Sequence, residues 1–180
     1  MAPLGFASGQ YGALAGMTQP QANSGNAVLF VCTANISRSP MAAAIFRAIL
    51  QEMGGELNNW RIESAGTWAP QNRPAAPEVI ALLALRGMDI SDHRSRIVER
   101  DLLESFPLIL TMESGHKEAL LVEFRSLKGR VFTLAEIAGE TGSVEDPTGG
   151  PPEAYAQAAE EIERLLRLGF EKIVEKSVIH

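Results

Sequence analysis

Cysteine is almost absent from this chain, which has a single one, Cys32, among its 180 residues. One cysteine excludes an intrachain disulfide and any metal site built from several cysteines. A lone thiol also suits a reducing compartment, so we expect a cytoplasmic protein. No apolar run approaches the roughly 20 residues that span a bilayer, so no membrane segment is expected.

An excess of basic residues is absent as well. Lys and Arg total 16 against 22 Asp and Glu, which gives a net charge of −6 at pH 7. This balance argues against a general nucleic-acid binder, which would be expected to show a basic face. The length favours one domain with a full-sized core.

Charged side chains are missing altogether from residues 1–26, which are rich in Gly, Pro, Gln, Asn and Ser. We interpret residues 1–26 as a flexible N-terminal tail and residues 27–180 as the folded domain. A secretory signal is not expected, because the segment has no basic start and its glycines interrupt any apolar core.

The most informative segment is residues 27–41, AVLFVCTANISRSPM. Its apolar first part predicts a strand that is buried on both faces of a parallel sheet. Ser39 and Pro40 are typical of a helix N-cap and a first helical residue, and a helix is expected over 41–53. A strand, a tight loop and a helix N-terminus form an anion site, because backbone N–H groups and the helix dipole favour negative charge.

Cys32 and Arg38 stand at the two ends of this loop. A helix N-terminus and a nearby cation favour an ionised, nucleophilic thiol. The planar guanidinium of Arg38 matches two oxygens of a phosphate. The alternative is that Cys32 is a small buried hydrophobe, as cysteines after a core strand commonly are. The strand before the loop and the Ser-Pro helix start after it favour the phosphate site.

Strands alternate with helices along the rest of the chain. We expect strands at 60–66, 108–112 and 131–134, helices at 74–86, 100–105, 113–124 and 151–176, and loops at 90–97 and 139–152. This alternation predicts an α/β fold with a parallel sheet that is covered by helices on both faces. Ligands bind in such folds beyond the carboxyl ends of the strands, which is where residues 32–38 fall.

Four motifs within residues 27–176 together resemble the low-molecular-weight protein tyrosine phosphatases. They are VCTANISRSP at 31–40, SAGT at 64–67, DHRSR at 92–96 and EDP at 145–147. The resemblance implies a flavodoxin-like four-stranded parallel sheet with helices on both faces, and it makes 27–180 a phosphatase domain. The implied activity is hydrolysis of protein phosphotyrosine or other aryl phosphates through a phosphocysteine intermediate, with no cofactor and no metal.

The resemblance also assigns roles to individual residues. Cys32 is the nucleophile, Arg38 holds the phosphate oxygens, and Asp146 is the general acid. Asp146 precedes a proline, which favours an extended loop, although Asp-Pro alone is a common turn. The other implied substrate-binding residues are Thr33, Ala34, Asn35, Ile36, Ser37, Ser39 and Trp68.

A further set of residues is expected to support the loop. Asn35, Ser64 and His93 match family positions that brace the loop through hydrogen bonds. Ser39 is expected to cap the helix, to donate its hydroxyl to the sulfur, or to do both. His116 and His180 look like surface residues, and no role is assigned to them.

Three positions depart from the family pattern. Ser37 stands where a second cysteine is usual, so we expect oxidised Cys32 to lack a resolving thiol. Thr148 stands where an aromatic residue is common, which leaves Trp68 as the one evident stacking wall. Ala43 stands where glutamate is common. These changes bear on the preference for phosphotyrosine more than on the phosphatase chemistry.

Three alternative functions fit parts of this sequence. Thiol-dependent arsenate reductases resemble the family in fold and loop, but they relay oxidation through further cysteines, which this chain lacks. A phosphoarginine-specific relative typically has threonine at the position of Ile36, and an apolar residue there favours an aryl phosphate. A non-catalytic phosphate-binding module would need neither Cys32 nor Asp146 beside Arg38.

Overall fold

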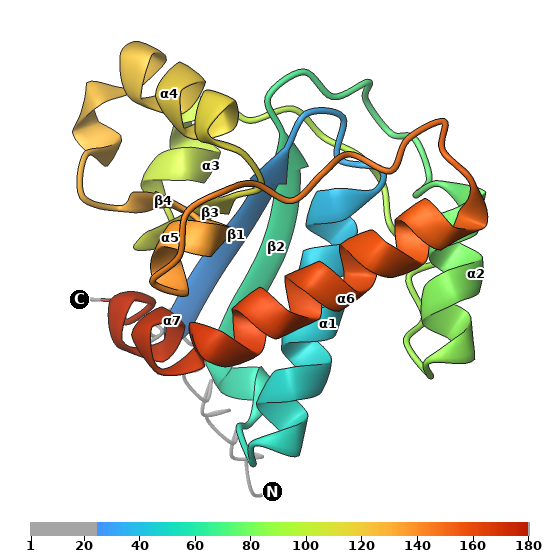
Figure 1. Ribbon diagram of the computed structural model, residues 1–180. Coiled ribbons are helices and arrows are strands. Elements are labelled where there is room, and N and C mark those ends of the chain that lie inside the picture. Colours follow the sequence, from blue (N-terminus) through green and yellow to red (C-terminus); the bar gives the residue numbers. More distant parts are fainter. Residues whose placement is uncertain (1–24, 180) are drawn as a thin grey trace, which may run out of the picture.

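The computed structural model describes residues 25–179, which form a four-stranded parallel sheet in the order β2-β1-β3-β4. The strands are β1 (Asn26–Cys32), β2 (Trp60–Gly66), β3 (Leu108–Thr111) and β4 (Val131–Thr133). Helices cover both faces of the sheet (Figure 1). The predicted α/β fold is confirmed. Of the expected N-terminal tail, residues 1–24 lie outside the described residues, and Asn26 already belongs to β1.

Strand β1 is buried because side chains pack on both of its faces, as its continuous apolar sequence predicts. Successive side chains point to opposite faces, so alternate residues enter two separate core clusters. One cluster receives Val28, Phe30 and Cys32, and the other receives Ala27, Leu29 and Val31. This alternation fixes the side of the sheet on which the Cys32 thiol lies.

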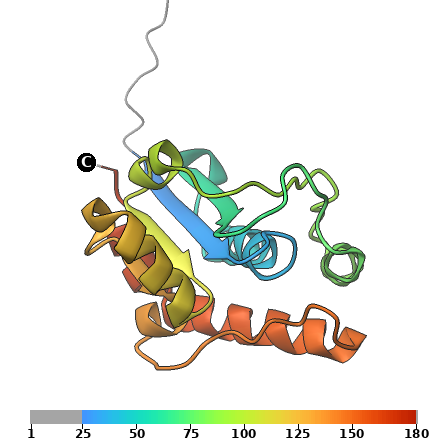
Figure 2. The same ribbon diagram turned by 90° about the horizontal axis from the view of Figure 1, so that it is seen from above.

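The helices divide between these two clusters. The first cluster contains residues of α1 (Arg38–Glu52), α2 (Pro77–Leu85), α5 (Leu134–Ile137), α6 (Pro152–Leu168) and α7 (Phe170–Lys176). The second contains residues of α3 (Arg100–Glu104) and α4 (Ser114–Glu123). Seen from above, α1 and α6 lie on one side of the strands and α3 lies on the other (Figure 2). Cys32 therefore faces the side of α1 and α6. None of the described helices is long and apolar enough to cross a bilayer.

Three predicted helix boundaries are wrong. The helix expected at 74–86 begins at Pro77. Helix α1 begins at Arg38 rather than after Ser39, and no side chain caps it. The last helix is interrupted at Gly169, where a Cβ would lie 3.1 Å from Ile137 Cγ2 and 3.3 Å from the backbone of Ala138. The short helix α5 was not expected, although Thr133 and Glu136 form the capping box that starts it. Short 3-10 turns at Leu57–Asn59 and Arg125–Leu127 complete the described elements.

The last described residues clamp the start of β1. Ala27 N donates to the backbone oxygen of Ser177 at 2.7 Å, and Ile179 N donates to that of Gly25 at 3.0 Å. The side-chain amide of Asn26 donates to Ser177 Oγ at 2.7 Å. The two described ends of the chain therefore meet at the amino end of β1, opposite the end at which Cys32 lies.

Candidate active site

Residues 33–37 form a tight loop between β1 and α1, at the carboxyl end of the sheet. Asn35 has a φ of 54°, a left-handed conformation that asparagine adopts more readily than most residues. The neighbouring strand β2 allows the loop to pack closely because it ends in glycine. A Cβ on Gly66 would lie 2.3 Å from the backbone oxygen of Thr33. The positive φ of Asn35 and the missing Cβ of Gly66 therefore both permit the tight path of this loop.

The backbone N–H groups of this loop are free of backbone partners. Within the described part of the chain, none of the amides of residues 33–37 donates to a backbone carbonyl. Buried backbone N–H groups in proteins are almost always hydrogen-bonded. A run of N–H groups without a backbone partner at a helix N-terminus is therefore a ready site for an anion. The geometry is that of a cradle for phosphate oxygens.

Cys32 lies at the start of this cradle, and its side chain has a polar neighbour. Its Sγ is 3.0 Å from Ser39 Oγ, although only 3% of the residue is exposed. The hydroxyl of Ser39 also lies 3.3 Å from the backbone oxygen of Ala65 and accepts from Asn35 Nδ2 at 2.9 Å. Ser39 therefore faces the sulfur and does not cap α1, so of its two expected tasks the structure shows only the contact with the thiol.

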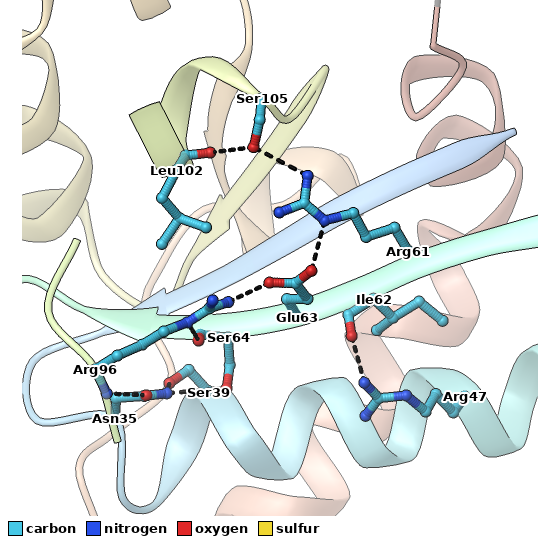
Figure 3. Close-up of polar contacts among 10 residues, drawn as sticks. All are labelled: Asn35, Ser39, Arg47, Arg61, Ile62, Glu63, Ser64, Arg96, Leu102 and Ser105. Atoms are coloured by element: carbon cyan, nitrogen blue, oxygen red, sulfur yellow. Dashed lines mark hydrogen bonds and ion pairs between the residues drawn. The ribbon is translucent and has the colours of Figure 1, made fainter. Parts of the chain in front are cut away.

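Of the three residues expected to brace the loop, Ser64 and His93 both contact the third, Asn35. Figure 3 shows Asn35 beside Ser64 and Ser39. Asn35 Nδ2 donates to the hydroxyl of Ser64 at 2.9 Å, as well as to that of Ser39. Its Oδ1 accepts from the backbone N–H of Arg96 at 3.0 Å. His93 Nε2 lies 2.7 Å from the backbone oxygen of Asn35, and because a carbonyl only accepts, this nitrogen carries the proton.

Charged residues extend this network beyond Asn35 (Figure 3). Arg96 Nε donates to the backbone oxygen of Ser64 at 3.0 Å, and its guanidinium pairs with Glu63. Glu63 also pairs with Arg61, which donates to Ser105 Oγ at 3.0 Å. Burial by itself would raise the pKa of Glu63, but the hydrogen bonds from Arg61 and Arg96 outweigh it and lower the pKa. Glu63 is therefore ionised and holds both guanidinium groups.

Arg38 is buried at the far end of the loop, with 1% of its surface exposed. Its guanidinium donates to the Glu113 carboxylate, to the backbone oxygen of Val144 at 2.9 Å and to Asp146 Oδ2 at 2.8 Å. A buried guanidinium requires such partners, because removing a charge from water is costly. Glu113 directly precedes α4, and Val144 and Asp146 belong to the segment between α5 and α6. Arg38 therefore joins the loop to two other parts of the chain.

Asp146 lies in the segment that runs across the carboxyl end of the strands (Figure 1). Its side chain is 44% exposed, and its Oδ1 accepts from the backbone N–H of Thr148 at 3.1 Å. Burial alone would raise the pKa of Asp146, but the hydrogen bonds from Thr148 and the charge of Arg38 outweigh it and lower the pKa. The carboxyl is therefore ionised at neutral pH in this arrangement.

His116 contradicts the expectation that it lies on the surface. It is 7% exposed in the first turn of α4, and its Nε2 lies 2.8 Å from Thr33 Oγ1. The reason is topological: α4 follows β3, so its first turn packs against the carboxyl end of the sheet, beside the loop. His180 lies outside the described residues.

The remaining predicted site residues lie around the loop. Trp68 is 77% exposed, and its backbone N–H donates to the backbone oxygen of Thr33 at 3.0 Å. Trp68 lines a cavity of about 230 Å³ together with Ala69, Pro70 and Ile97. Ala34 and Ile36 are partly exposed, whereas Ser37 is buried and its hydroxyl has no partner among the described residues.

The residue pattern of the sequence does not indicate the roles of two site residues, Glu113 and Arg96. Glu113 begins the helix predicted at 113–124 and has no predicted role, although a polar residue close after a parallel strand lies at the ligand-binding edge of the sheet. Arg96 ends the DHRSR motif, but nothing in its spacing indicates that its backbone N–H reaches Asn35. No group of three or more His, Cys, Asp or Glu side chains in the described residues is arranged to hold a metal ion.

Comparisons with known proteins agree with this geometry. The sequence profile of the family described as low molecular weight phosphotyrosine protein phosphatase matches residues 27–178. The protein-arginine-phosphatase of Bacillus subtilis (strain 168) is 38% identical over 141 residues, which cover 78% of this chain and 91% of that protein. The low molecular weight protein-tyrosine-phosphatase PtpB of Staphylococcus aureus is 34% identical, with 77% and 93% covered.

A solved structure supports the same assignment. The low molecular weight protein tyrosine phosphatase from T. tengcongensis is 40% identical and superposes with a TM-score of 0.76, covering 82% of this chain and 99% of that one. Sequence profile, relatives and structure agree over nearly the whole described region. The chain therefore belongs to the low molecular weight phosphotyrosine protein phosphatase family, a family of cysteine-dependent phosphatases.

Proposed function

We propose that this protein hydrolyses phosphotyrosine in proteins, with Cys32 as the nucleophile, Arg38 as the phosphate clamp and Asp146 as the general acid. One observation carries the proposal. Arg38, which ends the loop that Cys32 begins, lies 2.8 Å from Asp146, so the loop and the acid belong to one site. The same pairing tells against a non-catalytic phosphate-binding module, which has no use for an acid there.

The first chemical step is attack of the Cys32 thiolate on phosphorus. A sulfur–phosphorus bond forms while the bond from phosphorus to the tyrosine oxygen breaks. Asp146 gives its proton to that oxygen, which leaves as a neutral phenol. The free amides of residues 33–37 and the guanidinium of Arg38 stabilise the three remaining phosphate oxygens.

The second step returns the enzyme to its starting state. Asp146, now a carboxylate, takes a proton from a water molecule that attacks phosphorus. The sulfur–phosphorus bond breaks, and the electron pair returns to sulfur. Ser39 Oγ, 3.0 Å from the sulfur, donates a hydrogen bond to the departing thiolate. Orthophosphate is the product.

Asp146 must become protonated for the first step, yet its pKa is lowered where it pairs with Arg38. We infer that a bound phosphate resolves this conflict. Its oxygens take over the guanidinium hydrogen bonds, and its negative charge disfavours a second anion nearby, so the pKa of Asp146 rises. The acid thus becomes competent when a substrate is present.

Tyrosine is proposed rather than arginine because the partly exposed apolar side chain of Ile36 and the ring of Trp68 suit an aryl group. The relative from Bacillus subtilis is named for action on protein arginine, which makes phosphoarginine the second candidate. Ile36 is the position at which a threonine is typical of phosphoarginine-specific relatives.

The test is hydrolysis of two peptides of one sequence, phosphorylated on tyrosine or on arginine, by the purified chain. We expect the larger kcat/KM with phosphotyrosine, and we expect Ile36→Thr to shift the ratio towards phosphoarginine. Val122→Ala, on an exposed position of α4, is the control that leaves the ratio unchanged. A larger kcat/KM with phosphoarginine would replace the proposed substrate class, and phosphate binding without turnover of either peptide would favour the binding module.

The bounds of the phosphatase domain and the cellular compartment of the protein are also proposals. We propose residues 27–180 as the phosphatase domain, which the profile match over 27–178 supports. A cytoplasmic location is supported by the single cysteine of the sequence, because a reactive lone thiol is stable in a reducing compartment.

Peroxide is expected to inactivate the enzyme without full recovery in excess thiol. Peroxide oxidises the Cys32 thiolate to sulfenic acid, and with Ser37 in place of a cysteine, no second sulfur in the chain can trap it as a disulfide. Further oxidation to sulfinic acid is irreversible. The measurement is the activity that dithiothreitol restores after timed exposure to peroxide.

The matched variant for this experiment is Ser37→Cys, which supplies a neighbouring thiol in the same loop. It should recover a larger fraction of its activity than the wild type after equal exposure. Complete recovery of the wild-type enzyme would show that the absence of a second cysteine does not have this consequence.

A further inference from the structure

His116 is a buried polar side chain that the proposed chemistry does not use. It comes from α4, which lies on the face of the sheet opposite α1 (Figure 1), and its Nε2 lies 2.8 Å from the hydroxyl of Thr33. Thr33 directly follows Cys32 and is partly exposed in the loop. His116 Nδ1 is fully buried and has no hydrogen-bond partner among the described residues.

The charge of His116 follows from its surroundings. Burial lowers the pKa of the imidazole, and Arg38 lowers it further, whereas the carboxylates of Glu113 and Asp146 raise it. The net effect is a lowered pKa, so the ring is neutral at pH 7. A neutral imidazole carries one N–H, on either Nε2 or Nδ1.

The position of that proton follows from the unpartnered nitrogen. A proton on Nδ1 would bury an N–H donor without an acceptor, which is costly and rare. A proton on Nε2 lets the ring donate to Thr33 Oγ1 and leaves only a lone pair unpaired at Nδ1. The Nε2–H form is therefore favoured, and Thr33 Oγ1 is the acceptor of this hydrogen bond.

A hydroxyl that accepts from His116 keeps its own hydrogen free. The Thr33 hydroxyl forms no other hydrogen bond among the described side chains. Resting on the proposed phosphatase function, we propose that His116 is a positioning residue that orients the Thr33 hydroxyl as a donor to a non-bridging oxygen of the bound phosphate ester. Thr33 then contacts substrate through its side chain as well as its amide, and a residue of the opposite helix layer sets the direction of that contact.

The proposal predicts that removing either partner weakens phosphate binding. Thr33→Val deletes the hydroxyl at nearly constant volume, and His116→Leu deletes the donor that orients it. Each should lower kcat/KM for para-nitrophenyl phosphate about tenfold, the upper end for one neutral hydrogen bond. The change should fall on KM and on inhibition by inorganic phosphate, because the contact exists before and during the reaction.

Conservative variants and a double mutant separate this role from a merely structural one. Thr33→Ser and His116→Gln keep the hydroxyl and the donor, and they should remain within about threefold of the wild type. The Thr33→Val/His116→Leu double variant should be no worse than the poorer single variant, because both act through one contact. Wild-type kinetics in Thr33→Val, or effects that multiply in the double variant, would overturn the proposal.

Nitrogen-15 NMR of the wild-type imidazole decides the tautomer without any variant that has to fold. The expected signal is a proton on Nε2 of His116 at pH 7, and a proton on Nδ1 would overturn the proposal. If the wild type turned over no phosphate ester, the proposed function would fail separately. Binding of inorganic phosphate by wild type and Thr33→Val, measured by calorimetry, would then decide whether the hydroxyl contacts the anion.

Discussion

Cys32→Ser is expected to lower kcat for para-nitrophenyl phosphate by about 10⁴-fold or more. A serine hydroxyl stays protonated in the loop and is a far weaker nucleophile than a thiolate, so no covalent intermediate forms. The loop itself should persist, because the small polar side chain still meets Ser39, 3.0 Å from the present sulfur. The measurement is steady-state turnover together with binding of inorganic phosphate by calorimetry.

Phosphate binding is the internal control of this experiment. Cys32→Ser should bind inorganic phosphate within a few-fold of the wild type, which shows that the amides of residues 33–37 and Arg38 remain in place. Val122→Ala, exposed on α4, should keep full turnover. Turnover at the wild-type rate in Cys32→Ser would remove Cys32 from the reaction and leave the loop as a binding element.

Asp146→Asn is expected to lower kcat with phenyl phosphate by about 10²-fold or more. Arg38 and the backbone N–H of Thr148 donate to different oxygens of the carboxylate, so the single amide oxygen can keep only one of these two contacts. The amide has no acidic proton to give. The effect should shrink with para-nitrophenyl phosphate, whose leaving group departs without protonation. Comparing the two esters in wild type and variant measures the dependence on the leaving group.

The neighbouring carboxylate supplies a matched control. Glu145 precedes Asp146 on the same segment and is exposed, and the carboxylates that pair with Arg38 in the described residues are those of Glu113 and Asp146, so Glu145→Gln should leave kcat unchanged with both esters. An unchanged rate of Asp146→Asn on phenyl phosphate would take Asp146 out of the proposed site.

The dependence on pH has a definite sign. Protonated Asp146 is the active form in the first step, so kcat with phenyl phosphate should fall as the pH rises through the pKa of this carboxyl in the substrate complex. That pKa is higher than in the structure described, where Thr148 and Arg38 lower it. Asp146→Asn should lack this decline.

The sequence was sufficient for the parts of the site that depend on local pattern. An apolar run into a cysteine, followed by Ser-Pro, places the loop correctly because strand burial and the position of the loop are local properties. Asn35 forms hydrogen bonds with Ser64 and with His93. The alternation of strands and helices gives the correct sheet.

Local sequence pattern does not predict side-chain contacts that depend on the three-dimensional arrangement. Local pattern alone makes Ser39 a helix cap, because serine usually caps helices, but its hydroxyl meets the sulfur, which is the contact that the family resemblance implied. His116 looked exposed because a single histidine near the start of a polar helix resembles a surface residue. Its burial depends on how α4 packs beside the loop, which requires the three-dimensional arrangement.

The clamp between residues 25–27 and 177–179 has a practical consequence for protein engineering. Because the two described ends are hydrogen-bonded neighbours, a short glycine linker from 179 to 25 would yield a circular permutant, with new termini at the exposed turn around Gly129. The linker would lie at the amino end of β1, and Cys32 lies at its other end. The seven residues of this strand span about 20 Å, which is therefore the distance from the linker to the thiol. A fluorophore or carrier attached at that linker would leave the entrance for phosphorylated proteins unobstructed.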